Sequence, residues 1–158
     1  MDTEKLSYMT ADKAVSGSQG VVWVTYNDTG ERYCFARLVN LEAKAKLNKA
    51  TLPVLGRTGK VHKLGSWEGS GTAKMYYCDS TMRKRVAQYK NTGKMFTMDI
   101  EVYNDDETSS IDAQAVTLKE CLLDEIVIAK IDAEADYLEE EISFTFDDFD
   151  IPDEFNER

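Results

Sequence analysis

The chain from residue 138 to residue 151 alternates apolar and polar residues inside an acidic tract. Single hydroxyl residues separate Ile142, Phe144 and Phe146, so one face of an extended segment would be apolar. A disordered acidic tail would lack these aromatic residues. The pattern therefore predicts a β-strand with Ile142, Phe144 and Phe146 in the core, and this strand would hold the neighbouring carboxylates on a folded surface.

Strand-like alternation recurs along much of the chain. The segments that show it are 21–26, 33–39, 41–47, 96–103 and the stretch around Val116 and Leu118. The first two flank residues 27–30 (Asn-Asp-Thr-Gly), which tolerate the positive φ of a hairpin turn. A polar run at 104–110 joins the last two in the same way. These features predict two hairpins in a mainly β chain.

Residues 126–131 (Ile-Val-Ile-Ala-Lys-Ile) would be apolar on both faces of a strand. An antiparallel sheet usually has one wet face, so a strand of this kind needs cover on both sides. The segment therefore predicts a strand that a second layer or another subunit covers.

One segment, about 80–92, has a helical period. Met82, Val86 and Tyr89 recur at i, i+4 and i+7, and Gly93 follows as a stop signal. We expect one α-helix there, flanking the sheets. Its other faces carry a basic cluster of Arg83, Lys84, Arg85 and Lys90. The cluster is either a solvated face above a core stripe or a face that docks a partner.

Residues 51–71 contain five glycines and a proline and have no sustained period, which predicts a long loop. Loops of about 20 residues in compact domains are usually functional or disordered. This segment is too apolar for a plain linker, because it contains Leu52, Val54, Leu55, Leu64 and Trp67. We therefore expect the loop to become ordered against another surface.

The charge of the chain is concentrated at one end. The 158 residues have a formal net charge of −10, and residues 132–158 alone contribute −11. Affinity for nucleic acids comes largely from Lys and Arg that displace counterions, so this charge argues against duplex DNA as a bound ligand. The length predicts a single domain over residues 1–158.

Targeting and redox signals are sparse. No apolar run approaches the roughly 20 residues that a membrane span needs, and no apolar segment follows Met1, so neither a membrane span nor a signal peptide is expected. Cys34, Cys78 and Cys121 are widely spaced and form no C-x-x-C pair, which is typical of thiols in a reducing cytoplasm.

Candidate catalytic and metal motifs fail on their spacing. Residues 56–60 (Gly-Arg-Thr-Gly-Lys) lack both the four-residue interval and the Ser or Thr of a phosphate loop. His62 is the only histidine and has no Cys or carboxylate at ligand spacing. The aspartates of 147–150 are not followed by a calcium-binding loop. We therefore predict no enzymatic activity, no catalytic residue, no cofactor and no bound metal.

Five blocks of sequence together resemble a known family. They are Leu41-Glu-Ala-Lys44, Pro53-Val-Leu-Gly-Arg57, Gly69-Ser-Gly-Thr-Ala-Lys-Met-Tyr-Tyr77, Lys90-Asn-Thr-Gly-Lys94 and Glu139-Glu-Glu-Ile-Ser-Phe-Thr-Phe-Asp-Asp-Phe-Asp-Ile151. Across residues 41–151 the chain resembles the tail tube proteins of contractile-tailed bacteriophages, specifically those of PBSX-type defective phages and related phage-tail-like bacteriocins. The acidic triplet that leads into alternating aromatics is the most specific block.

The resemblance implies two packed antiparallel sheets that form a β-barrel-like sandwich with one flanking helix. It also implies six-fold rings of this subunit that stack into a hollow tube inside a contractile sheath. It implies contacts with sheath, baseplate and tape measure proteins, and a place in a virion tail assembled in the bacterial host cytoplasm. On this basis Leu52, Val54, Leu55, Arg57, Leu64 and Trp67 would stack the rings. Asp99, Glu101, Asp124 and Glu125 are candidates for an acidic lumen through which DNA passes unbound. The basic helix cluster could face the sheath.

Two other classes of function remain open from the residues. An acidic β domain could mimic DNA and sequester a basic protein, which only the charge of residues 132–158 supports. An enzyme with a carboxylate pair is the second alternative, but the sequence offers neither a metal set nor a nucleophile with its base.

Overall fold

A computed structural model describes residues 11–14, 16–17, 20–35, 38–107, 109, 111 and 113–156. The strands within this part are β1 (Gly20–Tyr26), β2 (Arg32–Cys34), β3 (Leu38–Leu52), β4 (Val61–Tyr76), β5 (Met98–Asn104), β6 (Gln114–Glu125), β7 (Glu139–Phe146) and β8 (Asp148–Asp153). One α-helix, α1 (Thr81–Thr92), and a short 3-10 helix at Ala11–Lys13 complete the described elements. The mainly β fold with one flanking helix is confirmed.

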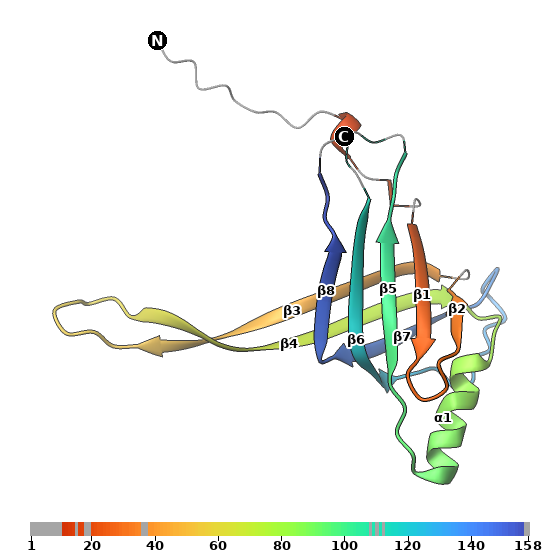
Figure 1. Cartoon of the computed structure of the whole chain (residues 1–158). Coiled ribbons are helices and arrows are strands. Elements are labelled where there is room, and N and C mark those ends of the chain that lie inside the picture. The colour runs from red at the N-terminus through yellow and green to blue at the C-terminus, as the bar shows by residue number, and fades with distance from the viewer. Residues whose placement is uncertain are drawn as a thin grey trace.

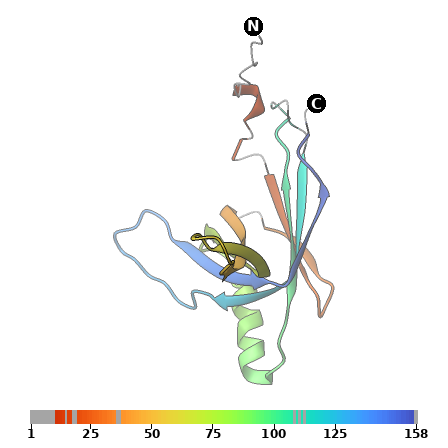
Figure 2. The same ribbon diagram turned by 90° about the vertical axis from the view of Figure 1, so that its left-hand side faces the viewer.

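The strands form two antiparallel sheets that share β6. Sheet A runs β2-β1-β5-β6-β8, and sheet B runs β3-β4-β7-β6. The first part of β6 pairs with β5 and β8, and its last residues pair with β7. Sheet B crosses sheet A in Figure 1, and Figure 2 shows the two sheets from the side of the arm. This arrangement is the predicted barrel-like sandwich, and the sheet does not close.

The core lies between the two sheets, where alternate residues of each strand meet. Its fully buried members include Val24, Tyr26, Met75, Met98, Ile100 and Cys121. The C-terminal strand contributes Ile142, Phe144 and Phe146, which are 1%, 1% and 5% exposed. Ser143 and Thr145, on the other face of β7, are partly exposed. The acidic segment is therefore anchored by the aromatic face of β7.

Two aromatic rings of β7 cover two glycines of β4. Phe144 is paired with Gly71 and Phe146 with Gly69. A Cβ at Gly71 would lie 2.4 Å from Cζ of Phe144 and 2.9 Å from the backbone oxygen of Glu42. Gly in a strand often marks a place where another group approaches closely. The Gly-Ser-Gly stretch is therefore a packing requirement of the sheet.

Replacing Gly71 by Ala should lower the free energy of unfolding by about 1–3 kcal/mol, the usual cost of overpacking. The ring of Phe144 would have to move away from β4, and the opposite carbonyl of Glu42 leaves little room. Gly59→Ala is the matched control, because a Cβ there meets no atom within 4 Å. Thermal melts of both variants check the expectation, which equal stability of the two variants would contradict.

Helix α1 follows a turn held by Asp79 and ends at a glycine C-cap, while the side chain of its N-cap residue, Ser80, makes no capping hydrogen bond. The carboxylate of Asp79 accepts the N–H of Thr81 at 3.0 Å, and the N–H of Gly93 is donated to the carbonyl of Tyr89 at 2.8 Å. Gly93 has φ 73°, the left-handed conformation that a helix C-terminus favours. Met82 is the buried residue of the helix. The predicted helix over 80–92 is confirmed to within one residue.

The predicted loop over 51–71 is wrong. β3 continues to Leu52 and β4 starts at Val61, so the two strands form a long hairpin and only residues 53–60 connect them. β7 pairs with β4 from Gly69 onward, and residues 46–68 therefore project beyond sheet B with no third strand beside them. We call this segment the arm (Figure 1). Strand β4 continues through Gly65, which lies at the register shift of the β3–β4 ladder near residue 48.

The strand predicted for residues 126–131 is also wrong. β6 ends at Glu125, and the chain then leaves sheet B as an irregular segment that returns at β7. Ile128 and Ile131 are 62% and 93% exposed in the subunit. The segment does not join sheet B beside β6 or β4, because β7 lies between these two strands. Within the described residues, no helix is long and apolar enough to span a membrane.

Candidate functional site

The arm is a basic segment of an acidic protein. Residues 46–68 contain five Lys or Arg residues and one acid, Glu68, whereas the whole chain has a net charge of −10. The five bases are Lys46, Lys49, Arg57, Lys60 and Lys63. None of them forms a salt bridge within the described part of the subunit. The arm therefore presents unneutralised positive charge away from the body.

The arm also exposes apolar side chains along its length. Their exposed fractions are 56% for Leu47, 44% for Leu52, 45% for Val54, 101% for Leu55, 58% for Leu64 and 37% for Trp67. Trp67 stands at the root, where its ring centroid is 5.5 Å from that of Phe149. The residues predicted to stack rings, with Arg57 at the tip, all lie on this one hairpin. In a monomer these apolar side chains would be exposed to water, and an exposed apolar surface is typical of an interaction site.

The outward face of sheet A is the acidic surface of the body. Trp23, Glu101, Thr117 and Asp150 lie in one row across β1, β5, β6 and β8. Glu101 accepts a hydrogen bond from Arg32 at 2.8 Å, and both side chains are partly exposed. Lys119 pairs with Asp150 in the same way.

The carboxylates on this face are partly held by hydrogen bonds. Asp99 accepts the amide of Asn27 at 3.1 Å and the backbone N–H of Glu120 at 3.2 Å. The hydrogen bond from Lys119 to Asp150 raises the pKa of that lysine, which stays charged to higher pH. The face therefore carries a fixed acidic surface with no free cation among the residues described on it.

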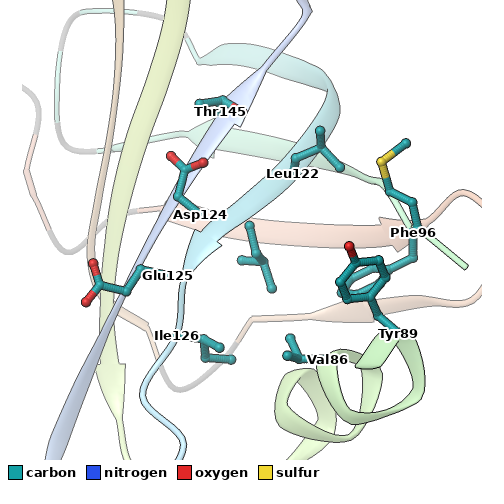
Figure 3. Close-up of a pocket in the computed structure, with 10 residues that line it drawn as sticks. Val86, Tyr89, Phe96, Leu122, Asp124, Glu125, Ile126 and Thr145 are labelled. Atoms are coloured by element: carbon teal, nitrogen blue, oxygen red, sulfur yellow. The ribbon is translucent and has the colours of Figure 1, made fainter. Parts of the chain in front are cut away.

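Asp124 and Glu125 do not share this face with Asp99 and Glu101. They end β6 in sheet B, where both are exposed beside a groove of about 390 Å³. Its apolar lining comes from α1, β6 and the segment that precedes β5. The lining residues are Val86, Tyr89, Met95, Phe96, Leu122, Leu123, Asp124, Glu125, Ile126 and Thr145 (Figure 3). The four predicted lumen carboxylates are thus split between two surfaces.

Two of the four helix bases hold α1 to the body. Arg83 pairs with the buried Glu140 and lies over the ring of Tyr77 at 4.5 Å. Arg85 pairs with Asp28 and lies over the rings of Tyr26 and Phe96. The hydrogen bond from Arg85 lowers the pKa of Asp28, so this pair persists until the pH falls through that lowered value. Lys84 and Lys90 are the exposed members of the cluster.

The three cysteines differ in accessibility. Cys121 is buried, and this burial raises the pKa of its thiol to about 12, whereas Cys34 and Cys78 are exposed. Because only the thiolate is reactive, we expect a soluble alkylating reagent at pH 8 to label Cys34 and Cys78 and to spare Cys121 until the chain is denatured. Mass spectrometry before and after denaturation checks this. Labelling of all three thiols in the folded chain would contradict the packing around β6.

The described residues offer no cluster of side chains that could hold a metal ion. No group of three His, Cys, Asp or Glu side chains lies close enough to hold an ion in this part of the chain. His62 lies exposed on β4 in the arm. The surfaces described above can bind and align another macromolecule.

Sequence reasoning missed the basic arm because it treated 51–71 as a loop and read the charge only at the C-terminus. The signal was present, since no Asp or Glu occurs between Glu42 and Glu68. A stretch of 25 residues without an acid is unusual in a chain with 29 acids. Mapping charge along the chain together with strand pairing would have found it.

The chain resembles a curated bacterial protein over nearly its whole length. It is 30% identical to the "Phage-like element PBSX protein XkdM" of Bacillus subtilis strain 168 over 149 residues, which is 94% of this chain and 97% of that protein. Two solved structures are similar in fold. One is a chain of the anti-feeding prophage baseplate, with a TM-score of 0.65, 13% identity and coverage of 87% of this chain and 94% of that one.

The other is a chain of the PVC sheath–tube complex, an extracellular contractile injection system in its extended state. It has a TM-score of 0.64, 10% identity and coverage of 89% of this chain and 93% of that one. At these identities the two structures support the fold alone. The model of one family matches residues 7–153, which is most of the chain. The chain therefore belongs to the family described as "Phage tail tube protein", and it is a structural component of a virion tail.

Proposed function

We propose that this tail tube subunit forms the inner tube of a contractile phage tail or phage-tail-like particle, in rings of six that stack around a lumen. The PBSX relative and the similar chains from contractile systems support the contractile class. The observation that carries the proposal is the arm, a basic apolar hairpin that projects from an acidic body. A surface of this kind needs a partner outside its own subunit.

Self-assembly explains the arm and the open sheet edges together. The sheet path ends at β2 and β3, whose outer edges have no neighbour within the described part. Unpaired edges are usually protected, and a ring of subunits can cover them. An arm that binds a different surface on the next copy makes a heterologous contact, which generates an open filament when it does not close. A tube of stacked rings would cover the open sheet edges and would give the arm a binding surface on another copy.

The outward face of sheet A is the proposed lumen wall. Asp99 has no salt bridge within the described part and would repel DNA phosphates, whereas Glu101 and Asp150 are paired with Arg32 and Lys119. Without free Lys or Arg the wall cannot gain affinity by counterion release, so DNA would pass without adhering. Asp124 and Glu125 lie at the groove beside α1 and are not assigned to the lumen.

The remaining surfaces are assigned to other tail components. Lys84 and Lys90 would face the sheath, since Arg83 and Arg85 are occupied within the subunit. Baseplate and tape measure proteins would contact the ends of the tube. The chain would act as one domain over residues 1–158, without catalysis, and would assemble in the host cytoplasm. The match to the tail tube family supports a structural role.

Electron microscopy of concentrated protein tests the proposal, with annuli or hollow rods of six-fold symmetry as the expected result. Raising the salt concentration should weaken assembly, because a basic arm and an acidic body attract each other through charges that salt screens. A monodisperse monomer at every protein and salt concentration would contradict the proposal. It would favour the DNA-mimic alternative, which size-exclusion chromatography with a basic partner can then examine.

A further inference from the structure

The tip of the arm is a compact apolar and basic unit. Val54 and Leu55 are 45% and 101% exposed, and Arg57 and Lys60 follow within five residues. Gly56 has φ 78°, and the N–H of Arg57 is donated to the carbonyl of Val54 at 3.3 Å, so the chain turns sharply here. The turn places two aliphatic side chains and two cations on one short segment.

The groove beside α1 offers the complementary chemistry. Tyr89 and Met95 are 49% and 66% exposed although they line an apolar surface. Asp124 and Glu125 stand on one side of the groove, as Figure 3 shows. Neither carboxylate has an ion-pair partner in the described part of the subunit. The groove is therefore apolar in its lining and acidic at its edge.

We propose that the groove beside α1 receives the arm tip of a second copy of this chain, with Val54 and Leu55 against the apolar lining. Arg57 and Lys60 would then face Asp124 and Glu125. This inference rests on the proposed function, because it identifies where the arm binds in the tube. A groove of about 390 Å³ has room for two aliphatic side chains.

A second copy fits better than another partner for two reasons. The same chain supplies both the unpaired cations of the tip and the unpaired carboxylates of the groove. The arm tip of each added subunit would therefore pair with the carboxylates of the subunit before it. The arm also leaves the body on the side away from α1, so it cannot bend back to its own groove (Figure 1). Tip and groove are therefore different surfaces at different ends, and each contact leaves a free tip and a free groove.

Disulfide cross-linking tests the contact. In a background with Cys34→Ser and Cys78→Ser, which removes the exposed thiols, Leu55→Cys is combined with Tyr89→Cys. After oxidation with copper–phenanthroline, assembled protein should give a ladder of dimers, trimers and larger species on a non-reducing gel. Leu55→Cys with Asn91→Cys is the matched control, because Asn91 lies about 200° around the helix from Tyr89 and should give at least tenfold less ladder.

Two results of the cross-linking overturn the inference. Tubes without a ladder would show that the arm binds elsewhere, and a ladder with Ile151→Cys in place of Tyr89→Cys would locate it on β8. If Tyr89→Cys disturbs the helix, Met95→Cys replaces it, since that side chain is more exposed and lines the same groove. If the unsubstituted chain forms no tubes, the proposed function fails and the groove contact fails with it. Tubes without a ladder leave the proposed function intact.

Charge reversal gives an independent measurement on the folded chain. Arg57→Glu with Lys60→Glu should reduce the sedimented tube mass at least tenfold without changing the melting temperature of the subunit. Adding Asp124→Lys and Glu125→Lys to the same chain should restore it to within threefold. Asp132→Lys with Glu134→Lys, a matched pair of exposed acids, should not restore it. Equal rescue by both pairs would mean that net charge alone drives assembly, which would contradict a specific groove contact.

Discussion

Shortening the arm should abolish tube assembly and leave the subunit folded. Replacing residues 48–66 by Asn-Gly keeps the existing pair of Leu47 with Trp67 and closes it with a two-residue hairpin turn. The deletion removes no buried residue, so the melting temperature should change little. Tube mass should fall on the order of 100-fold or more. A fully buried Leu contributes about 1.5–3 kcal/mol, and each 1.4 kcal/mol is tenfold in an equilibrium constant.

Sedimentation and electron microscopy measure the assembly, and circular dichroism measures the fold. Thr58→Ser keeps the length and charge of the arm and serves as the matched control. If the shortened chain unfolds, the arm supports the core and is misassigned. Normal tubes from a shortened, folded chain would remove the arm from the stacking contact and would leave its basic charge unexplained.

Phe144→Ala should cause the largest loss of stability of any single substitution in β7. Its side chain is 1% exposed, and its ring is the group that fills the space above Gly71. A buried Phe truncated to Ala costs about 3–5 kcal/mol through lost transfer energy and the cavity that remains. At about 2–4 °C per kcal/mol, this loss of stability should lower the melting temperature by roughly 6–20 °C.

The loss of stability caused by alanine substitutions should alternate from residue to residue along β7. Ile142→Ala and Phe146→Ala should also be costly, whereas Ser143→Ala and Thr145→Ala, on the partly exposed face, should each cost under about 1 kcal/mol. Thermal melts at concentrations where the subunit does not assemble check all five variants. Equal losses at Ser143 and Phe144 would mean that both faces of β7 are covered.

The strands that the sequence predicts correctly are those with one dry face. β1, β5 and β7 pack one face against the opposite sheet, so their burial follows the apolar and polar alternation closely. The helix was predictable for a similar reason, since Met82 is buried at the start of its apolar stripe and Gly93 ends it. An element that packs one face against the core has apolar residues at regular intervals, and these elements show that periodicity in the sequence.

The arm could not be predicted from periodicity because neither of its faces is buried in the subunit. Side chains of residues 61–68 of β4 are nearly all exposed, so folding of the subunit does not require apolar and polar residues to alternate there. The opposite error at 126–131 has the same origin, because Ile128 and Ile131 are exposed in the subunit although the apolar pattern predicts a covered strand. The groove depends on side chains from α1, the segment before β5, β6 and β7, which are far apart in the sequence, so no local pattern marks it.

β6 is one strand in two sheets, and this determines how the subunit responds to a mechanical load. A pull on the arm passes along β4 and across its ladder to β7, and from β7 to the end of β6. From there the load reaches sheet A through the peptide bonds of β6 itself. The two sheets are therefore joined by the covalent backbone of β6 as well as by the packing of their side chains, and a load on the arm reaches sheet A without depending on that packing.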